Sequence, residues 1–455
     1  MRALARCWIG AVTLATLLSA CSDSESPTGP AIADEPSFVT GNTSILWERV
    51  TTGWDFTCGV GVTRSKDQPG VTYSRAYCWG KNHLGQLGQN EITAPQAYPA
   101  VVRNQTACPL GPRPIQPDPG CEDFIWTEVS AGADHVCGLA SPRRPVIGGE
   151  RREPGRTLFC WGGNAAGQLG INQTVAASLY PYTVGQGWDV IDAGHRSACG
   201  TKRTGGTHCW GLSWFGQLGI GTPQFDGYTS PQPVDDPERP LTPIFQKLAH
   251  GYGHVCGLSG TSTHCWGLND AGQVGDPVLV DNARQNHVAP YHVTSAPPLV
   301  NVTAGLYHTC GLTQEGNAFC WGANDLGQLG RGTTGGNDPT PTRVSTTLRF
   351  TSIDAGGWHT CAVAIDGTAH CWGWDGWGQL GNVAGDAQVP SAVAGGQIYS
   401  SISADFLHTC GVTLKGKMLC WGDNSTGQLG TGVVGGGSEV PMGVVNGPII
   451  ASSQP

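Results

Sequence analysis

Paired cysteines are the residues of this 455-residue chain whose type and spacing point most clearly to chemistry. Fourteen of its 18 cysteines form seven pairs, and a Trp-Gly dipeptide follows the second member of each pair. The pairs are Cys58 with Cys78, Cys137 with Cys160, Cys199 with Cys209, Cys256 with Cys265, Cys310 with Cys320, Cys361 with Cys371, and Cys410 with Cys420. Turn signals such as Ser259-Gly260-Thr261 lie between the members, so we expect antiparallel hairpins that place the two thiols opposite each other. Opposed residues of an antiparallel pair have Cα atoms about 4.5–5.5 Å apart, which is within the range that a disulfide tolerates. The pattern therefore predicts disulfides in an oxidising compartment.

Two other uses of these cysteines stay open from the sequence. Buried free thiols can serve as small apolar residues. Zinc is the third reading, since His308 lies two residues before Cys310 and His370 directly precedes Cys371. Strand alternation points adjacent side chains to opposite faces, and no compact two-plus-two ligand spacing appears. The pattern therefore favours disulfides and predicts no metal or other cofactor.

Histidines form a second recurrent set, which could suggest acid–base catalysis. The His of a Gly-x-x-His-Thr segment aligns at His135, His254, His308, His359 and His408. A residue that recurs with the repeat is expected to be a structural hydrogen-bonder at the start of a strand, because a catalytic site would break the symmetry of the repeat. The sequence also contains no Gly-x-Ser-x-Gly, His-Glu-x-x-His or phosphate-binding loop motif. We therefore expect no catalytic residues.

The elements that position these residues are set by a Gly-Gln-Leu/Val-Gly motif that returns seven times, with a period of about 50 residues in the later copies. Each copy can be divided into four strands, and the 69 glycines and 31 prolines suit short strands joined by tight turns. Seven four-stranded units predict an all-β chain that closes into a seven-bladed β-propeller, with one disulfide per blade and the recurrent Trp between blades.

The combined motifs resemble the regulator of chromosome condensation repeat. They read Ala-Gly-x-x-His-Thr-Cys-x-Leu, Cys-Trp-Gly-x-Asn and Gly-Gln-Leu-Gly, and they cover residues 45 to 450. The resemblance implies a seven-bladed propeller. Its implication for activity is weaker, because the family includes a nucleotide-exchange factor for a small GTPase, a plant photoreceptor and secreted bacterial β-lactamase inhibitors.

The N-terminus has the features of an export signal. Arg2 and Arg6 precede an apolar run, which closes at Leu18-Ser19-Ala20-Cys21. This end resembles a bacterial lipobox, whose Cys becomes the lipidated first residue. The expected organisation is a signal peptide at 1–20, the anchor Cys21 with a flexible tether at 21–44, the propeller at 45–450 and a tail at 451–455. An ordinary cleaved signal with secretion is the alternative, and Ser22 after the anchor favours an outer membrane by resemblance to known sorting.

The remaining cysteines support the absence of a catalytic thiol. Cys108 and Cys121 bracket a proline-rich insertion and are expected to close it with an eighth disulfide. Cys7 is lost with the signal peptide, and Cys21 carries the lipid. No mature cysteine is then left as a nucleophile.

Insertions that depart from the repeat are the predicted partner-binding features, because binding commonly uses loops on a rigid scaffold. They are residues 62–75, 103–124 and 141–156, all expected on one face of the propeller. The third carries five arginines, Arg143, Arg144, Arg151, Arg152 and Arg156, on a chain of net charge −9. These cations suit an anionic protein or glycan, although a solvated loop set is the alternative. The acidic balance argues against nucleic acid.

These features predict a lipid-anchored extracytoplasmic scaffold of the cell envelope that binds a protein or a glycan. Two alternatives remain: an envelope hydrolase acting on peptide or glycan, and a structural surface-display protein without a dedicated partner. The oligomeric state and the strand that closes the ring do not follow from the sequence.

Overall fold

The computed structural model describes residues 45–64, 72–103, 124–142, 156–222, 224–235, 242–278 and 285–446. The predicted signal peptide at 1–20, the anchor and tether at 21–44 and the tail at 451–455 lie outside the described residues. The same holds for most of the three insertions, with Cys108, Cys121, Arg143, Arg144, Arg151 and Arg152. Arg156 is described.

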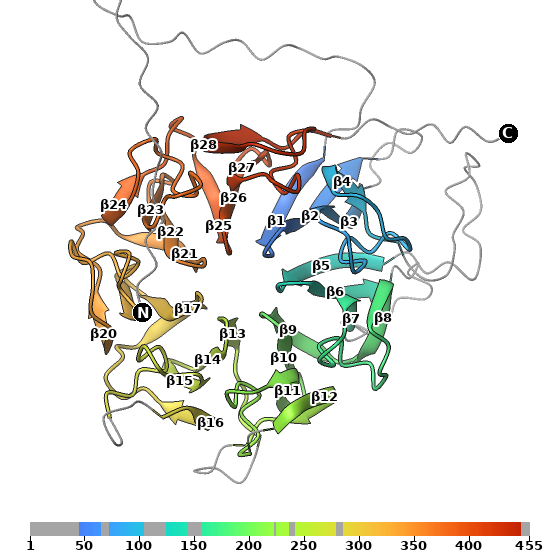
Figure 1. The fold of residues 1–455 in the computed structure, drawn as a ribbon, viewed down its shortest axis with the longest axis horizontal. Helices are drawn as coiled ribbons and strands as arrows, with labels where there is room; N and C mark the ends of the chain where they lie inside the picture. The colour runs from blue at the N-terminus through green and yellow to red at the C-terminus, as the bar shows by residue number, and fades with distance from the viewer. Residues whose placement is uncertain are drawn as a thin grey trace, which may run out of the picture. The chain divides into compact units, whose positions relative to one another are not determined.

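The described chain is all-β and forms seven four-stranded antiparallel sheets arranged around a central axis (Figure 1). Blades 1 to 3 contain β1 Leu46–Thr52, β2 Phe56–Arg64, β3 Thr72–Gly80 and β4 Gln96–Val101; β5 Phe124–Ala131, β6 His135–Pro142, β7 Thr157–Gly163 and β8 Ala177–Gln186; and β9 Trp188–Ala193, β10 Ser197–Lys202, β11 Gly206–Ser213 and β12 Gln224–Pro233. Blades 4 and 5 contain β13 Lys247–His250, β14 His254–Ser259, β15 Ser262–Gly267 and β16 His287–His292; and β17 Leu299–Ala304, β18 His308–Thr313, β19 Ala318–Gly322 and β20 Asp338–Arg343. Blades 6 and 7 contain β21 Phe350–Ala355, β22 His359–Ala364, β23 Ala369–Gly373 and β24 Ala387–Ala392; and β25 Tyr399–Ala404, β26 His408–Thr413, β27 Met418–Asp423 and β28 Gly437–Gly443.

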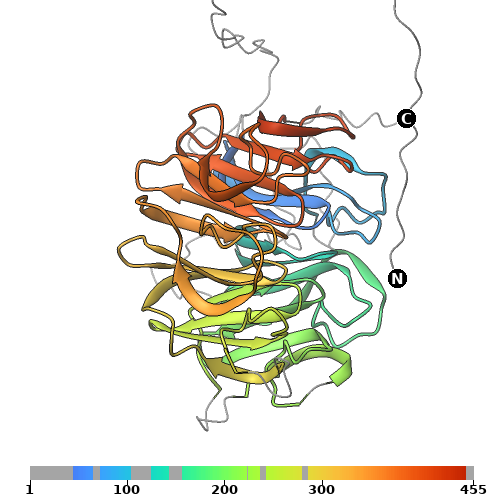
Figure 2. The same ribbon diagram turned by 60° about the vertical axis from the view of Figure 1, so that its left-hand side comes forward.

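This arrangement confirms the predicted seven-bladed β-propeller. The first strand of every blade lies innermost, and the sheets of neighbouring blades pack face to face (Figures 1 and 2). Within the part of the chain that the structure describes, no helix is long and apolar enough to cross a membrane.

Each blade is built from one continuous stretch of chain, including the two blades that meet where the ring closes. Blade 1 and blade 7 lie side by side and exchange no strand (Figure 1). Contacts such as Trp47 N donating to the Gly416 carbonyl at 2.9 Å and Trp79 Nε1 donating to the Gln428 carbonyl at 2.9 Å join the two. The ring is therefore closed by packing and hydrogen bonds between two complete sheets. We name this blade 1–blade 7 interface the ring seam.

The predicted cysteine pairs lie directly opposite each other in the second and third strands of every blade. All seven blades carry the disulfide, with Cα–Cα distances of 4.0 to 4.1 Å. In chain order, the bridges join Cys58 to Cys78, Cys137 to Cys160, Cys199 to Cys209, Cys256 to Cys265, Cys310 to Cys320, Cys361 to Cys371, and Cys410 to Cys420. The intrablade disulfides are confirmed, and the free-thiol and zinc readings of these cysteines are excluded.

The recurrent Trp fills the interface between blades, as expected. Trp161 of blade 2 is fully buried in a cluster with Phe56 and Val60 of blade 1, and Trp372 of blade 6 packs with Leu329 of blade 5. Burying a large aromatic side chain stabilises by roughly 1.5–3 kcal/mol. Each interface therefore has its own apolar core.

Candidate functional site

The three predicted insertions start and end at one end of the blades. Antiparallel pairing brings the ends of β2, β4 and β6 to the same side as the starts of β3, β5 and β7. Ser74 Oγ donates to the Trp126 carbonyl at 2.8 Å and ties blade 1 to blade 2 there. Part of the first insertion is regular strand, because β2 and β3 stay paired out to Arg64 and Thr72. The structure thus places the bases of the insertions together, on what we call the insertion face.

Arg156, the described member of the arginine set, is committed to contacts within the chain. Its guanidinium donates to the Asp189 carbonyl and lies 3.5 Å from the Glu128 carboxylate. Burial raises the pKa of Glu128, and the nearby Arg49 and Arg156 lower it. Arg156 therefore anchors the base of the third insertion to blade 3.

The recurrent histidines join neighbouring blades. In four interfaces, Nε2 of the histidine contacts the threonine hydroxyl that precedes the first cysteine of the next blade. These contacts are His254–Thr309 at 2.9 Å, His308–Thr360 at 2.9 Å, His359–Thr409 at 2.9 Å and His408–Thr57 at 2.8 Å. Burial lowers the pKa of His254, His308 and His359 to about 3 and that of His408 to about 4. These imidazoles are neutral structural groups.

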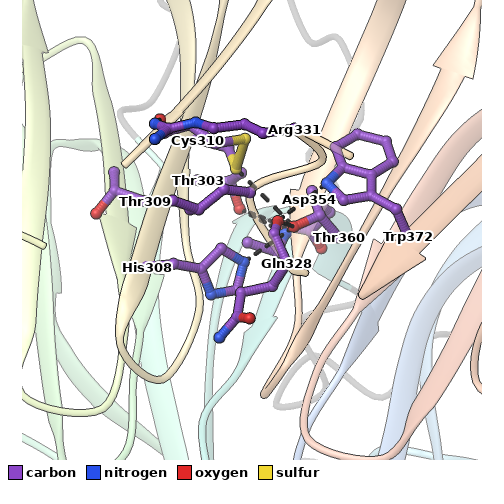
Figure 3. Close-up of a disulfide and its surroundings, with 12 residues drawn as sticks. Thr303, His308, Thr309, Cys310, Gln328, Arg331, Asp354, Thr360 and Trp372 are labelled. Atoms are coloured by element: carbon purple, nitrogen blue, oxygen red, sulfur yellow. Dashed lines mark hydrogen bonds between the residues drawn. A yellow bond between two sulfur atoms is a disulfide. The ribbon is translucent and has the colours of Figure 1, made fainter. Parts of the chain in front are cut away.

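The Gln of the Gly-Gln-Leu-Gly motif supplies the other half of this interface. In blade 5, the Gln328 carbonyl accepts from the Thr360 hydroxyl at 3.0 Å and from Trp372 Nε1 at 2.9 Å, both in blade 6 (Figure 3). Because Thr360 donates to Gln328, its hydroxyl oxygen accepts from His308 Nε2. A Trp-to-Gln bond of this kind occurs at every blade interface.

Three interfaces depart from the His–Thr pair, and in one of them Ser197 of blade 3 takes the histidine position and Val255 of blade 4 the threonine position. Phe56 of blade 1 takes the histidine position, and the next blade presents Val136, so both partners are apolar. His135 of blade 2 faces Ala198 at the threonine position, and both of its ring nitrogens are buried without a hydrogen-bond partner. The apolar Phe56–Val136 pair needs no hydrogen bond, whereas His135 lacks one.

A second set of bonds runs around the axis on the innermost strands, at six of the seven blade interfaces. In each bond, the side chain two positions before the loop between the first and second strands accepts a hydrogen bond from a backbone N–H of the next blade. The bonds are Ala131 N to Thr51 at 3.1 Å, Ala193 N to Ser130 at 2.9 Å, His250 N to Asp192 at 2.7 Å, Ala355 N to Thr303 at 3.0 Å, Ala404 N to Asp354 at 2.9 Å and Thr52 N to Ser403 at 3.1 Å. These polar groups hold the blades in a ring.

An axial cavity of about 310 Å³ lies inside this ring. Four acidic residues line it: Glu128, Asp192, Asp354 and Asp405. Burial raises the pKa of Asp354 to about 6, against the lowering effect of its bond from Thr303. Burial also raises the pKa of Asp405 well above its ordinary value, and the neighbouring Asp354 raises it further. The cavity is therefore a site of unfavourable negative charge.

Aromatic rings cover the axis at the end opposite the insertion face, where each first strand turns into the second. Trp54 stacks on His195 at 4.6 Å and on Phe406 at 4.8 Å between ring centroids. The set continues through His195–Tyr252, Tyr252–Tyr307 and Trp358–Phe406 contacts of 4.7, 5.8 and 5.2 Å. Burial lowers the pKa of His195 to about 4, so its ring is neutral in this stack.

Sequence reasoning missed both axial features. The signal was present in the repeat itself, since His250 stands where most other blades have Ala, and Asp405 stands where the other six blades have Gly. Those departures are visible once the Ala-Gly-x-x-His segments are aligned. Their meeting on the axis requires the closed ring.

Comparison with known proteins gives the following matches. Two models of the regulator of chromosome condensation (RCC1) repeat match residues 74–139 and 315–363, and residues 299–328, 350–379 and 399–428. The chain is 31 % identical to the human probable E3 ubiquitin-protein ligase HERC6 over 64 % of its own length and 26 % of that protein. It is 27 % identical to the mitochondrial RCC1 domain-containing protein RUG3 of Arabidopsis thaliana over 67 % of each. The chain thus spans about a quarter of HERC6.

Solved structures share the fold. The Saccharomyces cerevisiae protein Prp20p, described with its binding to Gsp1p and histones, superposes with a TM-score of 0.65 at 20 % identity, over 81 % of this chain and 85 % of that one. Human WBSCR16 superposes with a TM-score of 0.64 at 17 % identity, over 81 % and 93 %.

Proposed function

We propose that this seven-bladed β-propeller, whose repeats match the RCC1 models, is a binding scaffold held outside the cytoplasm by a lipid on Cys21. The proposed partner is an envelope protein or an anionic glycan. The proposed surface is the insertion face, formed by residues 62–75, 103–124 and 141–156. The proposal assigns the chain no catalytic residue and no nucleic-acid partner.

One observation carries the scaffold role: the recurrent polar residues are used between blades. His308 contacts Thr360, Thr360 donates to Gln328, and the same carbonyl accepts from Trp372. Acid–base catalysis needs groups that reach a substrate, and these are buried and neutral. This use of the repeat favours a rigid scaffold over an envelope hydrolase.

The disulfides support the proposed location. One bridge in each blade requires an oxidising compartment for assembly, and cytosolic thiols are kept reduced. A signal peptide that ends in Leu-Ser-Ala-Cys would deliver the chain to such a compartment.

The geometry of the insertion bases supports the proposed surface. β2, β4 and β6 end on one face, and Arg156 ties the base of the third insertion to Glu128 and Asp189. Loops fixed at their bases by a rigid scaffold are a common way to build a recognition surface. Prp20p, a structure of similar fold, is described with protein partners, which agrees with a binding role.

The anchor is tested by Cys21→Ala in a bacterial host, followed by membrane fractionation and metabolic labelling with a palmitate analogue. We expect the native chain to be labelled and membrane-bound, and the variant to be unlabelled. An unlabelled native chain that is secreted in soluble form contradicts the anchor.

The surface is tested by replacing residues 104–123 and 143–155 with short Gly-Ser linkers. This change removes Cys108 and Cys121 together, so no unpaired thiol is created, and it retains Arg156. Both forms are used as bait against envelope extracts after their melting temperatures are shown to agree. We expect the altered form to lose the specific partners. Identical capture by both forms counts against the insertion face, and the absence of specific capture by either supports the display alternative.

A further inference from the structure

Blades 4, 5 and 6 border a smaller cavity of about 210 Å³, away from the axis and on the end of the propeller opposite the insertion face. Tyr307 and Trp358 line it from the loops between the first and second strands of blades 5 and 6. Asp270, Asp325 and Asn337 line it from the connections between the third and fourth strands of blades 4 and 5. We name this hollow the side cavity.

The aromatic walls of the side cavity depart from the repeat. Tyr307 and Trp358 stand directly before the histidine position of their blades. The other five blades have Asp55, Asp134, Arg196, Gly253 and Leu407 there. Because the fold tolerates such different side chains at this position, it does not require an aromatic ring, and two rings in adjacent blades are candidates for individual function.

The carboxylates of the side cavity depart from the repeat at a second position. Asp270 and Asp325 follow the Asn that opens the turn after the third strand, and both are exposed. The other five blades have His83, Ala165, Trp214, Gly376 and Ser425 there. Departures at two unrelated positions of the repeat thus meet in one hollow.

The two rings are positioned by aromatic neighbours and stay half-buried. Trp358 contacts Trp374 and Phe406 at 5.5 and 5.2 Å between ring centroids, and Tyr307 contacts Tyr252 at 5.8 Å. Burial raises the pKa of Tyr307, and the nearby Tyr252 and Asp270 raise it further, so the phenol keeps its proton. The side cavity therefore has two fixed aromatic walls and a hydroxyl donor.

Gln328 supplies an independent sign that the side cavity takes a ligand. Its side chain lines the cavity, is 1 % exposed and accepts a backbone N–H of its own turn through Oε1 at 2.9 Å. Its Nε2 donates to no group in the described part of the chain, whereas Nε2 of the equivalent Gln168 donates to Asp134 at 3.1 Å. In Gln273 and Gln379 the same nitrogen is also unpaired but is sealed from solvent. A buried N–H at a cavity wall is unfavourable until an acceptor meets it.

The side cavity thus combines N–H and O–H donors, carboxylate and amide acceptors, and aromatic faces. A pyranose ring matches all of these, because its hydroxyls donate and accept hydrogen bonds and its C–H face packs on aromatic rings. The carboxylates of Asp270 and Asp325 disfavour an anionic sugar. An ammonium group would suit the carboxylates and the rings, but it offers no acceptor to the Gln328 N–H.

We infer that the side cavity binds one neutral pyranose unit of a glycan, packed against Tyr307 and Trp358 and hydrogen-bonded by the Gln328 Nε2 group and the Asp325 carboxylate. Its volume lies below the roughly 300–1,000 Å³ of sites that enclose a whole small molecule, which suits a single unit of a longer chain. This site is separate from the insertion face, for which an anionic glycan or a protein is proposed.

The test is saturation-transfer difference NMR on the full exported chain, with its disulfides formed, at pH 7.5. The neutral probes are the β-1,4-linked trimers of N-acetylglucosamine and of glucose. The trimer of galacturonic acid is the anionic comparison. Titration of each probe gives its Kd.

Three variants are titrated beside the native chain. Trp358→Leu removes an aromatic wall and inserts the residue type that blade 7 carries as Leu407, so it is expected to fold. Asp325→Ala removes a carboxylate and copies the residue of blade 2. Trp377→Leu is the matched control, because it removes an exposed Trp of blade 6 that is not part of the cavity wall, and blade 1 has Leu84 at that position.

We expect at least one neutral trimer to bind, with a Kd raised about tenfold or more by Trp358→Leu and raised by Asp325→Ala, while Trp377→Leu leaves it unchanged. The galacturonic acid trimer should bind more weakly than the neutral probe.

The inference is overturned if neither neutral trimer binds the native chain, or if the anionic trimer binds more tightly. It is equally overturned if Trp358→Leu, with an unchanged melting temperature, binds as tightly as the native chain, or if Trp377→Leu weakens binding as much. All three variants retain the insertions, so none of these results bears on the insertion face.

Discussion

The Nε2 atom of His408 in blade 7 lies 2.8 Å from the Thr57 hydroxyl in blade 1, although 351 residues separate the two in sequence. The same contact joins blades 4, 5, 6 and 7 in chain order. The ring seam is therefore chemically equivalent to an ordinary interface.

Removing the hydroxyl at the ring seam should destabilise the protein. Thr57→Val keeps the shape of the side chain but leaves the His408 N–H buried without an acceptor, at a cost of about 1–3 kcal/mol. The double variant Thr57→Val/His408→Phe copies the natural Phe56–Val136 pair and should recover part of that loss. Denaturant unfolding at pH 7.5 with the disulfides intact measures both free energies. A double variant less stable than Thr57→Val would contradict the pairing.

Supplying the missing partner of His135 should stabilise the chain. Ala198→Thr places a hydroxyl where Thr309 and Thr360 stand in other blades, and one added hydrogen bond contributes about 0.5–1.5 kcal/mol. Val255→Thr is the matched control, because the preceding blade has Ser197 at the histidine position. The midpoint of thermal unfolding should rise for Ala198→Thr only. A rise of equal size in the control would show that the hydroxyl acts without His135.

Stability should fall as the pH is lowered below 6.5. Burial holds the pKa of His359 at about 3, so the folded state binds fewer protons than the unfolded state, whose histidine titrates near 6.5. Between pH 6.5 and 4.5, each such histidine therefore lowers the free energy of unfolding by up to about 2–3 kcal/mol. Asp354 acts in the opposite direction, since its raised pKa of about 6 makes the folded state favour low pH. Burial also raises the pKa of Asp405 and Glu128, which act in the same direction as Asp354. More histidines than carboxyls are shifted by burial, so we expect the histidines to outweigh these groups.

Denaturant midpoints at pH 7.5, 6.0, 5.0 and 4.5 measure this dependence. Replacing one pair with His359→Phe/Thr409→Val should flatten the curve by the share of one histidine. A native midpoint that stays constant down to pH 4.5 would show that these imidazoles are not held neutral.

The disulfides should contribute in order of the loops they close. Replacing Cys310 and Cys320 with Ala opens a bridge with a separation of 10 residues, whereas Cys137 and Cys160 are separated by 23. The chain-entropy model gives about 2–3 kcal/mol for the shorter loop and about 0.7 kcal/mol more for the longer. Unfolding of the two double variants under oxidising conditions measures the difference. A larger loss from the shorter loop would contradict the chain-entropy account.

The repeat allowed the fold and the disulfides to be predicted because both are local. A hairpin register pairs Cys310 with Cys320 whatever the rest of the chain does. The axial cavity is different, because Asp192 and Asp405 are more than 200 residues apart and meet only once the ring is closed. The histidines were expected to form structural hydrogen bonds. Their partners could not be named, because each lies in the next blade.

Because each blade is one continuous segment of chain with its own disulfide, the unit that a gene duplication copies is also a complete sheet. A copied segment brings both halves of the interface with it: the His and Gln that face one neighbour, and the Thr and Trp that face the other. When a whole blade is duplicated, no new interface between blades therefore has to evolve. Selection is left free to act on single blades, as at Asp405, without redesigning the ring.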